Sequence, residues 1–331
     1  RVKGGTMMTD LDLWSAAIAA AGTRIAGRVL RTPLRKAGHL SARHGVPVYL
    51  KLENRQTTGA FKLRGATSAL LSLDSASRAR GVVTASTGNH GRALAHAARV
   101  EGIRCVVYIS TLVPANKAAA LEAEGADIRV TGDSQDEAEA AALAFAGQDG
   151  LAWIPPFDHA GVIAGQGTIG LEIVEELPEI GSVLIPLSGG GLAAGVTAAI
   201  KARSPATRAI GISMERGAAM HASLLAGHPV PVREEATLAD SLGGGIGLAN
   251  RYTFAMVRDL LDDVVLLTEE EIAAGIRAAA AEGETVEGAG AVGPGAILAG
   301  KVDLRGPIVA ILSGSNIDPA LHRKILAGET V

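Results

Sequence analysis

Short runs of β-branched and aliphatic residues alternate along the chain with longer, alanine-rich stretches. Within each run the apolar residues are continuous rather than alternating with polar ones, which is typical of strands buried on both faces of a parallel sheet. The stretches between the runs are long enough for crossover helices, so the pattern predicts an α/β protein made of βαβ units around mainly parallel sheets. The predicted strands lie in residues 46–52, 81–86, 104–110, 127–132, 182–189, 208–214, 262–268 and 307–314.

One part of this pattern is complete in itself. Residues 76–159 contain their own succession of strands and helices, and the succession ends where Pro155 and Pro156 interrupt it. We therefore expect a small inserted α/β domain at 76–159 and a larger domain formed by residues 1–75 and 160–331.

Composition excludes several classes of partner. The net charge of −3 comes from interspersed acidic and basic residues, so no basic stripe is present for a nucleic acid. No stretch approaches the roughly 20 apolar residues of a membrane helix, and no secretion signal is evident. Cys105 is the one cysteine and lies in an apolar run, so we expect core packing, no disulfide and a cytoplasmic location.

The segment after the fifth predicted strand favours a phosphate site. Residues 188–191 read Ser-Gly-Gly-Gly and lead directly into a helical stretch, and a glycine loop at a helix N-terminus presents free N–H groups to an anion. A plain glycine-rich connection is one alternative. Another is a dinucleotide fingerprint made of Gly189, Gly191 and Gly195 with Glu215 as the ribose-binding acid, which predicts an NAD-dependent oxidoreductase.

Two more strands run into small polar residues. Ser86, Thr87, Gly88, Asn89 and His90 follow the second predicted strand and open a helix, where they are able to bind a carboxylate; an ordinary N-cap and a structural histidine are the alternatives. Residues 313–316, Ser-Gly-Ser-Asn, follow the last strand. Because ligands of parallel sheets bind outside the carboxyl ends of the strands, these loops are expected to converge on one crevice.

Lys62 stands in an apolar setting, in the stretch TTGAFKLRGA. Burial there favours the neutral amine, and only a neutral amine attacks a carbonyl. A cofactor with an aldehyde and a phosphate, pyridoxal 5′-phosphate, accounts for the lysine, the phosphate loop and the carboxylate loop together.

The chain resembles the fold-type II pyridoxal-phosphate enzymes, specifically the serine/threonine dehydratase family. The resembling stretches are KLENRQTTGAFKLRGA, STGNHGRALA, IPPFDHAGVIAGQGTIGLEI, SGGGLAAG, TLADS, VEGAGAV and LSGSNID. The resemblance implies two doubly wound domains of the tryptophan synthase β type, with the cofactor in the cleft between them. It also implies a small-molecule amino-acid substrate and a homodimer.

Specific roles follow from the resemblance alone. Lys62 would bind the pyridoxal aldehyde covalently, Phe61 would cover a ring face, Asn89 would bond the ring hydroxyl and Ser313 would meet the ring nitrogen. The phosphate would be held by Ser188, Gly189, Gly190, Gly191 and Leu192. The implied reaction is loss of water from a β-hydroxy amino acid, giving a 2-oxo acid and ammonia.

Departures from the family pattern bear on the substrate. Racemases of this family carry a serine where this chain has Thr87, which retains a hydroxyl, so racemisation stays an alternative. Relatives with a divalent-cation site have an aspartate where this chain has His221, six residues after Glu215, so no metal is expected. Ser241 and Ser315 replace glycines and argue against plain threonine. The sequences of residues 213–224 and 237–254 resemble those of the dehydratases of hydroxyectoine utilisation.

Overall fold

The computed structural model describes residues 10–113 and 115–329 and contains each of the predicted strands. Six strands form one sheet in which every pair is parallel except the first two strands, which run antiparallel. In spatial order these strands are β1 (Leu34–Lys36), β2 (Val48–Lys51), β10 (Ile308–Ile311), β7 (Ser182–Pro186), β8 (Arg208–Met214) and β9 (Asp263–Leu267).

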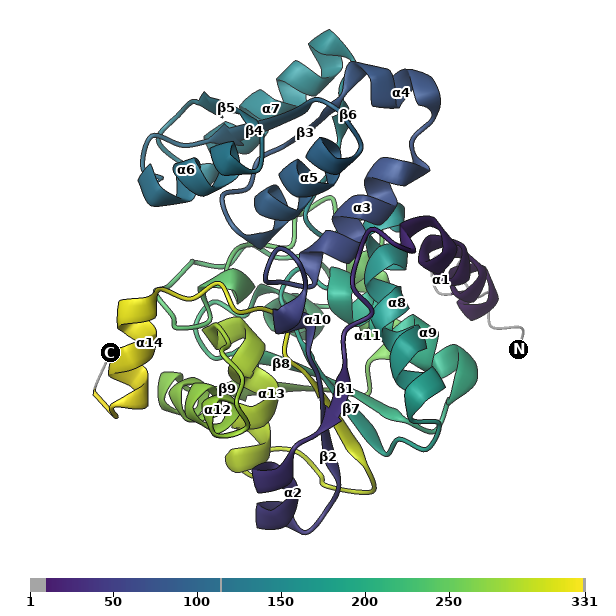
Figure 1. The fold of residues 1–331 in the computed structure, drawn as a ribbon, viewed down its shortest axis with the longest axis vertical. Coiled ribbons are helices and arrows are strands. Elements are labelled where there is room, and N and C mark those ends of the chain that lie inside the picture. Colours follow the sequence, from purple (N-terminus) through teal and green to yellow (C-terminus); the bar gives the residue numbers. More distant parts are fainter. Residues whose placement is uncertain (1–9, 114, 330–331) are drawn as a thin grey trace.

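A second, wholly parallel sheet forms a separate lobe, seen at the top of Figure 1. Its strands in order are β5 (Asp127–Val130), β4 (Cys105–Ile109), β3 (Val82–Thr84) and β6 (Ala152–Trp153). The accompanying helices are α4 (Ser75–Arg80), α5 (Asn89–Val100), α6 (Ala115–Ala123) and α7 (Gln135–Asp149). We call this the small lobe and the rest the large lobe. All four strands fall within 76–159, although the exact domain boundaries stay a prediction.

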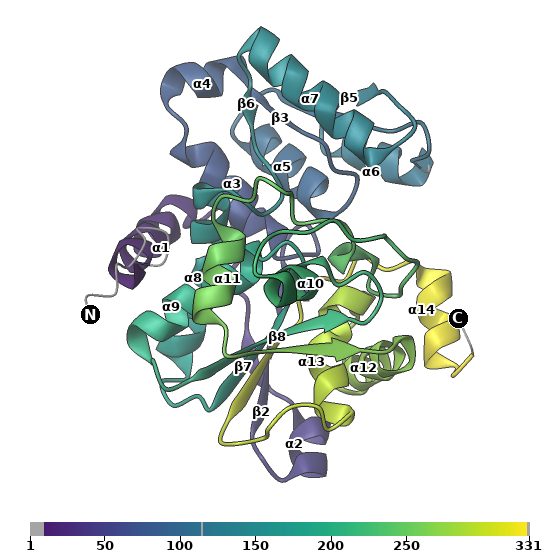
Figure 2. The ribbon, with the colours of Figure 1, turned by 180° about the vertical axis from the view of Figure 1, so that it is seen from behind.

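The large sheet is covered on both faces, as its continuous apolar strands require. Val309 and Ile311 of β10 pack in one core and Ile308 and Ala310 in another, because successive side chains point to opposite faces. The first face carries α1 (Leu11–Ile25), α8 (Ala160–Glu176), α9 (Gly191–Arg203), α10 (Ala219–Ala226) and α11 (Thr253–Leu260). The second carries α2 (Gly38–His44), α12 (Glu269–Ala281), α13 (Gly288–Leu298) and α14 (Pro319–Leu326). Figure 2 shows these layers from behind.

Helix α3 (Lys62–Ser72) connects the lobes by packing against α8 of the large lobe and α5 of the small lobe. Glycine permits the close approach to α8: a Cβ on Gly165 would lie 2.5 Å from the Arg64 carbonyl oxygen. The beginning of α3 is therefore fixed in position, and Lys62 is its first residue.

Two short strands were not predicted. β1 has three residues, two of them basic, and β6 has two residues. β1 lacks the apolar run on which strand prediction depends, and the apolar run around β6, residues 151–154, is short and stops at Pro155.

The loops predicted to bind ligands follow β3, β7 and β10. β7 and β10 are neighbours in the large sheet and parallel, so the loops at their carboxyl ends lie at one edge. Within residues 10–113 and 115–329, no helix has both the length and the hydropathy that a bilayer span requires.

Candidate active site

Lys62 lies at the start of α3 and points into the protein. Its Nζ donates to the Pro156 carbonyl oxygen at 2.7 Å and lies 5.2 Å from the centre of the Phe61 ring. The Phe61 amide in turn donates to the Ser313 carbonyl oxygen at 3.0 Å. Lys62 and Phe61 are thus held between residues 154–159 and the loop after β10.

The surroundings of Lys62 favour a neutral amine. Burial lowers the pKa of Lys62 to about 8, and the Glu287 carboxylate opposes part of that change. At pH 7.5 an amine with this pKa is about one quarter neutral. The amine therefore supplies a nucleophile and a base at physiological pH.

The triple glycine forms a loop shaped for an anion. β7 ends at Pro186, Gly190 has φ of 89°, and α9 begins at Gly191, so the first N–H groups of α9 face the loop without intrahelical partners. A Cβ on Gly189 would lie 2.4 Å from the Phe157 ring, which leaves no room for a side chain. Ser188 is half-buried and Leu192 is buried. The loop fits a phosphate that is bound through backbone N–H groups.

The 154–159 segment contacts both Lys62 and the glycine loop. Pro156 accepts the hydrogen bond from Lys62, and Phe157 packs on Gly189 and Gly191. The amine and the glycine loop therefore both contact residues 156 and 157 and lie near each other. A cofactor that carries both an aldehyde and a phosphate requires this proximity.

Asn89 connects the small lobe to this site. Its Nδ2 donates to Glu287 Oε1 at 2.8 Å, and its Oδ1 accepts from Asn316 Nδ2 at 2.5 Å. Glu287 also lies directly on Gly314, where a Cβ would be 2.6 Å from Oε1. The structure therefore brings Asn89 beside the loop that contains Ser313, and it adds Glu287 and Asn316, which sequence analysis did not assign.

Glu287 is a buried acid with a shifted pKa. Burial and the nearby Asp240 raise the pKa of Glu287 to about 7, against hydrogen bonds from Asn89, Ser241 and the Asn316 backbone that favour its charged form. The sequence signal was a glutamate directly before an apolar helix in VEGAGAV, a position that reads equally well as an N-cap.

The loop after β3 leaves its hydroxyl groups uncommitted to helix capping. Ser86 and Thr87 are half-buried, and α5 has Gly88 as its N-cap residue, with no side-chain cap bond within the described part of the chain. The ordinary N-cap alternative therefore fails for Ser86 and Thr87. The first N–H groups of α5 are oriented to bind an anion such as a carboxylate.

His90 is a neutral structural histidine. Its Nε2 lies 2.9 Å from the Ile154 carbonyl oxygen, which only accepts, so Nε2 carries the proton. Burial and the Lys62 charge lower the pKa of His90 to about 3. His90 is thus no acid at neutral pH, and its predicted side-chain role in substrate binding stays a proposal limited to a hydrogen-bond acceptor at Nδ1.

Glu215 and His221, which the NAD and metal alternatives require in addition to the glycine loop, are not buried. The Glu215 side chain is 53% exposed, 3.9 Å from the Lys301 ammonium, and His221 is half-buried on α10. Among residues 10–113 and 115–329, no cluster of three or more His, Cys, Asp or Glu side chains is arranged to hold a metal ion.

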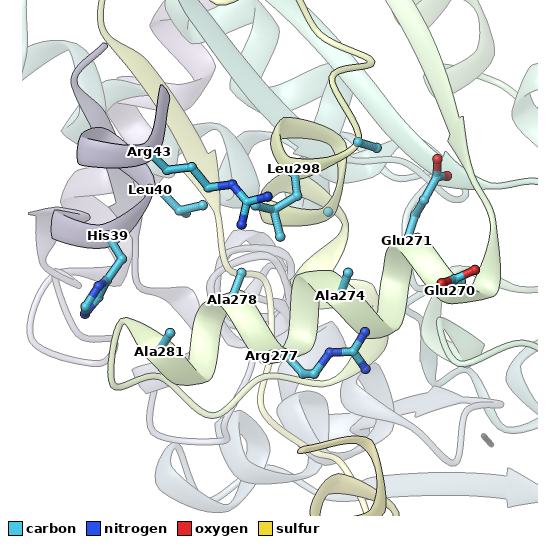
Figure 3. Close-up of a pocket in the computed structure, with 12 residues that line it drawn as sticks. His39, Leu40, Arg43, Glu270, Glu271, Ala274, Arg277, Ala278, Ala281 and Leu298 are labelled. Carbon is cyan, nitrogen blue, oxygen red and sulfur yellow. The ribbon is translucent and has the colours of Figure 1, made fainter. Parts of the chain in front are cut away.

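A cavity of about 510 Å³ lies away from this site, between α2, α12 and the end of α13 (Figure 3). His39 and Arg43 reach it from α2, and Glu270, Glu271 and Arg277 come from α12, over an aliphatic floor. These charged residues are exposed or half-buried. The cavity shares no residue with the Lys62 site and contains no buried base, so we place the chemistry at Lys62.

Comparisons with known proteins agree with this geometry. The family model described as "Pyridoxal-phosphate dependent enzyme" matches residues 25–314. A provisionally named threonine dehydratase of Sinorhizobium fredii is 56% identical over 97% of both chains. An L-threonine ammonia-lyase of Geobacter sulfurreducens is 43% identical over 91% of this chain and 75% of its own. The processed threonine deaminase isoform 2 of Solanum lycopersicum superposes with a TM-score of 0.89 at 37% identity, covering 99% of this chain and 91% of that one.

Proposed function

Because the chain belongs to the pyridoxal-phosphate dependent enzyme family, we propose that it removes water from a β-hydroxy amino acid and releases a 2-oxo acid and ammonia. The observation that carries the proposal is the Lys62 amine, which has a lowered pKa and is joined through Pro156 and Phe157 to a glycine loop at a helix N-terminus. The threonine dehydratase and ammonia-lyase names of the relatives support the same reaction class.

Each predicted cofactor-binding residue has a role in the proposal. Lys62 binds the cofactor aldehyde, Phe61 lies against the ring, Asn89 bonds the ring hydroxyl and Ser313 meets the ring nitrogen. The phosphate is held by the Ser188 hydroxyl and by the backbone N–H groups of Ser188, Gly189, Gly190, Gly191 and Leu192. The cofactor supplies an aldehyde that condenses with amines and a ring that withdraws electrons from Cα.

The protein then moves protons and binds charge. The N–H groups and hydroxyls of Ser86, Thr87 and Gly88 hold the substrate carboxylate at the N-terminus of α5. Lys62 Nζ, once neutral, takes the proton from the substrate Cα, and the β-hydroxyl leaves as water. The released enamine tautomerises to an imine, and hydrolysis of the imine consumes one water and gives the 2-oxo acid and ammonia. Ser313 is neutral and does not hold the ring nitrogen protonated, which favours prompt loss of the hydroxyl.

The residues around Glu287 bear on which β-hydroxy amino acid is the substrate. Ser241 replaces the usual glycine and lies beside Asp240, an acid that acts on Glu287. We propose a β-hydroxy amino acid other than plain threonine, for example a hydroxyaspartate-like compound or one derived from hydroxyectoine.

Two measurements test the function. Borohydride reduction of the yellow holoenzyme should abolish its visible band and label Lys62, as located by peptide mass spectrometry. A panel of hydroxy amino acids, assayed with and without magnesium, should release ammonia and 2-oxo acid in equal amounts. An unlabelled Lys62, or ammonia release that Lys62→Ala leaves unchanged, would contradict the proposal. Chiral analysis of the recovered substrate tests the alternative of racemisation, in which the Thr87 hydroxyl would take part.

We also propose a cytoplasmic homodimer. A single buried cysteine without a disulfide partner suits a reducing compartment, and the family resemblance implies the dimer. Sedimentation of the purified holoenzyme at micromolar concentration would reveal a mass of one chain instead of two if the dimer is wrong.

A further inference from the structure

A chain of hydrogen bonds crosses between the lobes at the candidate site. Arg92 Nη1 of α5 donates to Asn316 Oδ1 at 2.9 Å, Asn316 Nδ2 donates to Asn89 Oδ1 at 2.5 Å, and Asn89 Nδ2 donates to Glu287 Oε1 at 2.8 Å. The four residues come alternately from the small and the large lobe. Each amide in the chain therefore has its donor and acceptor ends specified.

Asn89 gains a fixed orientation from this arrangement. An asparagine amide has one oxygen and an NH₂ group with two hydrogens. The oxygen is used by Asn316, and one hydrogen is used by Glu287, so one N–H remains for a further acceptor. If the amide turned over, its oxygen would face the Glu287 carboxylate and its nitrogen would face the Asn316 donor, and both contacts would be lost.

Glu287 is placed for this contact rather than for capping its own helix. It is the N-cap residue of α13, yet its carboxylate makes no cap bond within the described residues, and the side chain is 4% exposed. The hydrogen bond that its carboxylate accepts comes from the Asn89 NH₂ group. The charged groups that act on it are Lys62 of α3 and Asp240 of η3 (Asp240–Leu242).

We propose that Glu287 is a positioning residue that fixes the Asn89 amide so that its free N–H points toward the cofactor ring hydroxyl. The proposal rests on the proposed function, in which Asn89 bonds that hydroxyl. It predicts that the Glu287 carboxylate affects how strongly the protein prefers a cofactor with a ring hydroxyl, although Glu287 acts through Asn89 and does not bond the hydroxyl itself. Glu287→Gln tests this, because a neutral amide oxygen accepts more weakly than a carboxylate and the other end of the amide only donates.

The experiment compares two ligands on the apoprotein. One is pyridoxal 5′-phosphate and the other is its analogue with hydrogen in place of the ring hydroxyl; dissociation constants are measured by fluorescence titration. The ratio of the two constants is the hydroxyl preference. The matched control is Glu284→Gln, a buried glutamate three residues earlier whose partners are Arg35, Arg55 and Asn54, outside the site.

We expect Glu287→Gln to reduce the hydroxyl preference about tenfold, the usual effect of one misplaced hydrogen bond, with the analogue bound nearly as in wild type. Glu284→Gln should keep the wild-type preference. Asn316→Ala, at an exposed position that folding tolerates, should also reduce the preference and serves if Glu287→Gln is not recovered folded.

Three results would overturn the inference. An unchanged preference in Glu287→Gln shows that Asn89 is oriented without it, while an equal loss of affinity for both ligands shows that Glu287 only supports the fold. If wild type itself shows no hydroxyl preference, the role of Asn89 in the proposed function is wrong as well, which separates that failure from the other two.

Discussion

Lys62 and Arg64 are two cations in the first turn of one helix, the first half-buried and the second buried, and their surroundings differ in the number of carboxylates. Arg64 donates to Glu53 at 2.8 and 2.9 Å and to Glu172 at 2.6 and 2.9 Å. Lys51 donates to the same Glu172 at 2.6 Å, which completes a group of two cations and two anions. Among the residues that the structure describes, the Lys62 ammonium donates its hydrogen bond to a backbone carbonyl, that of Pro156.

The difference shows how the fold separates a structural charge from a reactive one. Burial alone would lower the pKa of Arg64, but Glu53 and Glu172 together raise it above its ordinary value, so this cation never loses its proton. At Lys62 burial is opposed only by Glu287, and the pKa falls to about 8. The lysine amine, with its lowered pKa, is able to do chemistry, whereas the arginine guanidinium keeps its proton and is held by two carboxylates.

The largest expected effect comes from removing the reactive cation. Lys62→Ala should lower ammonia release by about 10⁴-fold or more, because nucleophile and base are lost together. Thermal unfolding should occur at the wild-type temperature or higher in the apoprotein, since a poorly paired buried cation is costly. A variant that lost both activity and folded structure would contradict the contrast with Arg64.

Removing the structural cation should give the opposite result. Arg64→Met leaves Glu53 and Glu172 buried with Lys51 alone for balance, so we expect a loss of about 3–5 kcal/mol in the free energy of unfolding, measured with urea. Activity per folded molecule should fall much less than in Lys62→Ala. An unfolding free energy within 1 kcal/mol of wild type, on the scale of an exposed pair, would show that the group of four charges is not a structural unit.

Much of this contrast was outside the reach of sequence. The apolar runs predicted the βαβ pattern because strands buried on both faces have a distinctive composition, and the glycine loop and Lys62 stand in short motifs. Arg64, only two residues after Lys62, carries no mark that separates it from a surface residue. Its partners Glu53 and Glu172 come from segments 11 residues before it and 108 residues after it.

Glu287 and Asn316 were missed for a related reason. Their importance lies in contacts with Asn89, which is 198 and 227 residues away in the chain. The short strands β1 and β6 were missed because β1 is mostly basic and β6 has only two residues, so pairing with a neighbouring strand is what makes them strands. Tertiary contact is the information that local pattern lacks.

The pH dependence of the free energy of unfolding tests Glu287, the carboxylate that acts on Lys62. The pKa of Glu287 is raised to about 7 by folding, so its stabilising proton is fully present below its unfolded value near 4.5 and is lost as pH rises through 7. His90, with a pKa lowered to about 3, acts in the opposite direction up to its unfolded value of 6.5. The wild-type curve therefore combines two opposing trends.

A difference curve isolates Glu287. Glu287→Gln should gain stability relative to wild type between pH 5 and pH 8, by about 2 kcal/mol, because only the wild-type side chain becomes charged over that interval. Urea unfolding of the two apoproteins at matched pH values measures this. A difference that does not vary with pH would mean that Glu287 is charged, or neutral, throughout.

The smallest effect is expected at an exposed pair whose geometry matches that of Arg64. Arg31 donates to Glu175 at 2.9 Å and to Glu176 at 3.1 Å, so two carboxylates bind one guanidinium at similar distances. Its side chain is 53% exposed, against 1% for Arg64. Because water screens such pairs, Arg31→Met should cost no more than about 1 kcal/mol in the free energy of unfolding, and less in 0.5 M salt. A loss as large as that of Arg64→Met, independent of salt, would show that hydrogen-bond geometry rather than burial makes a cation structural in this fold.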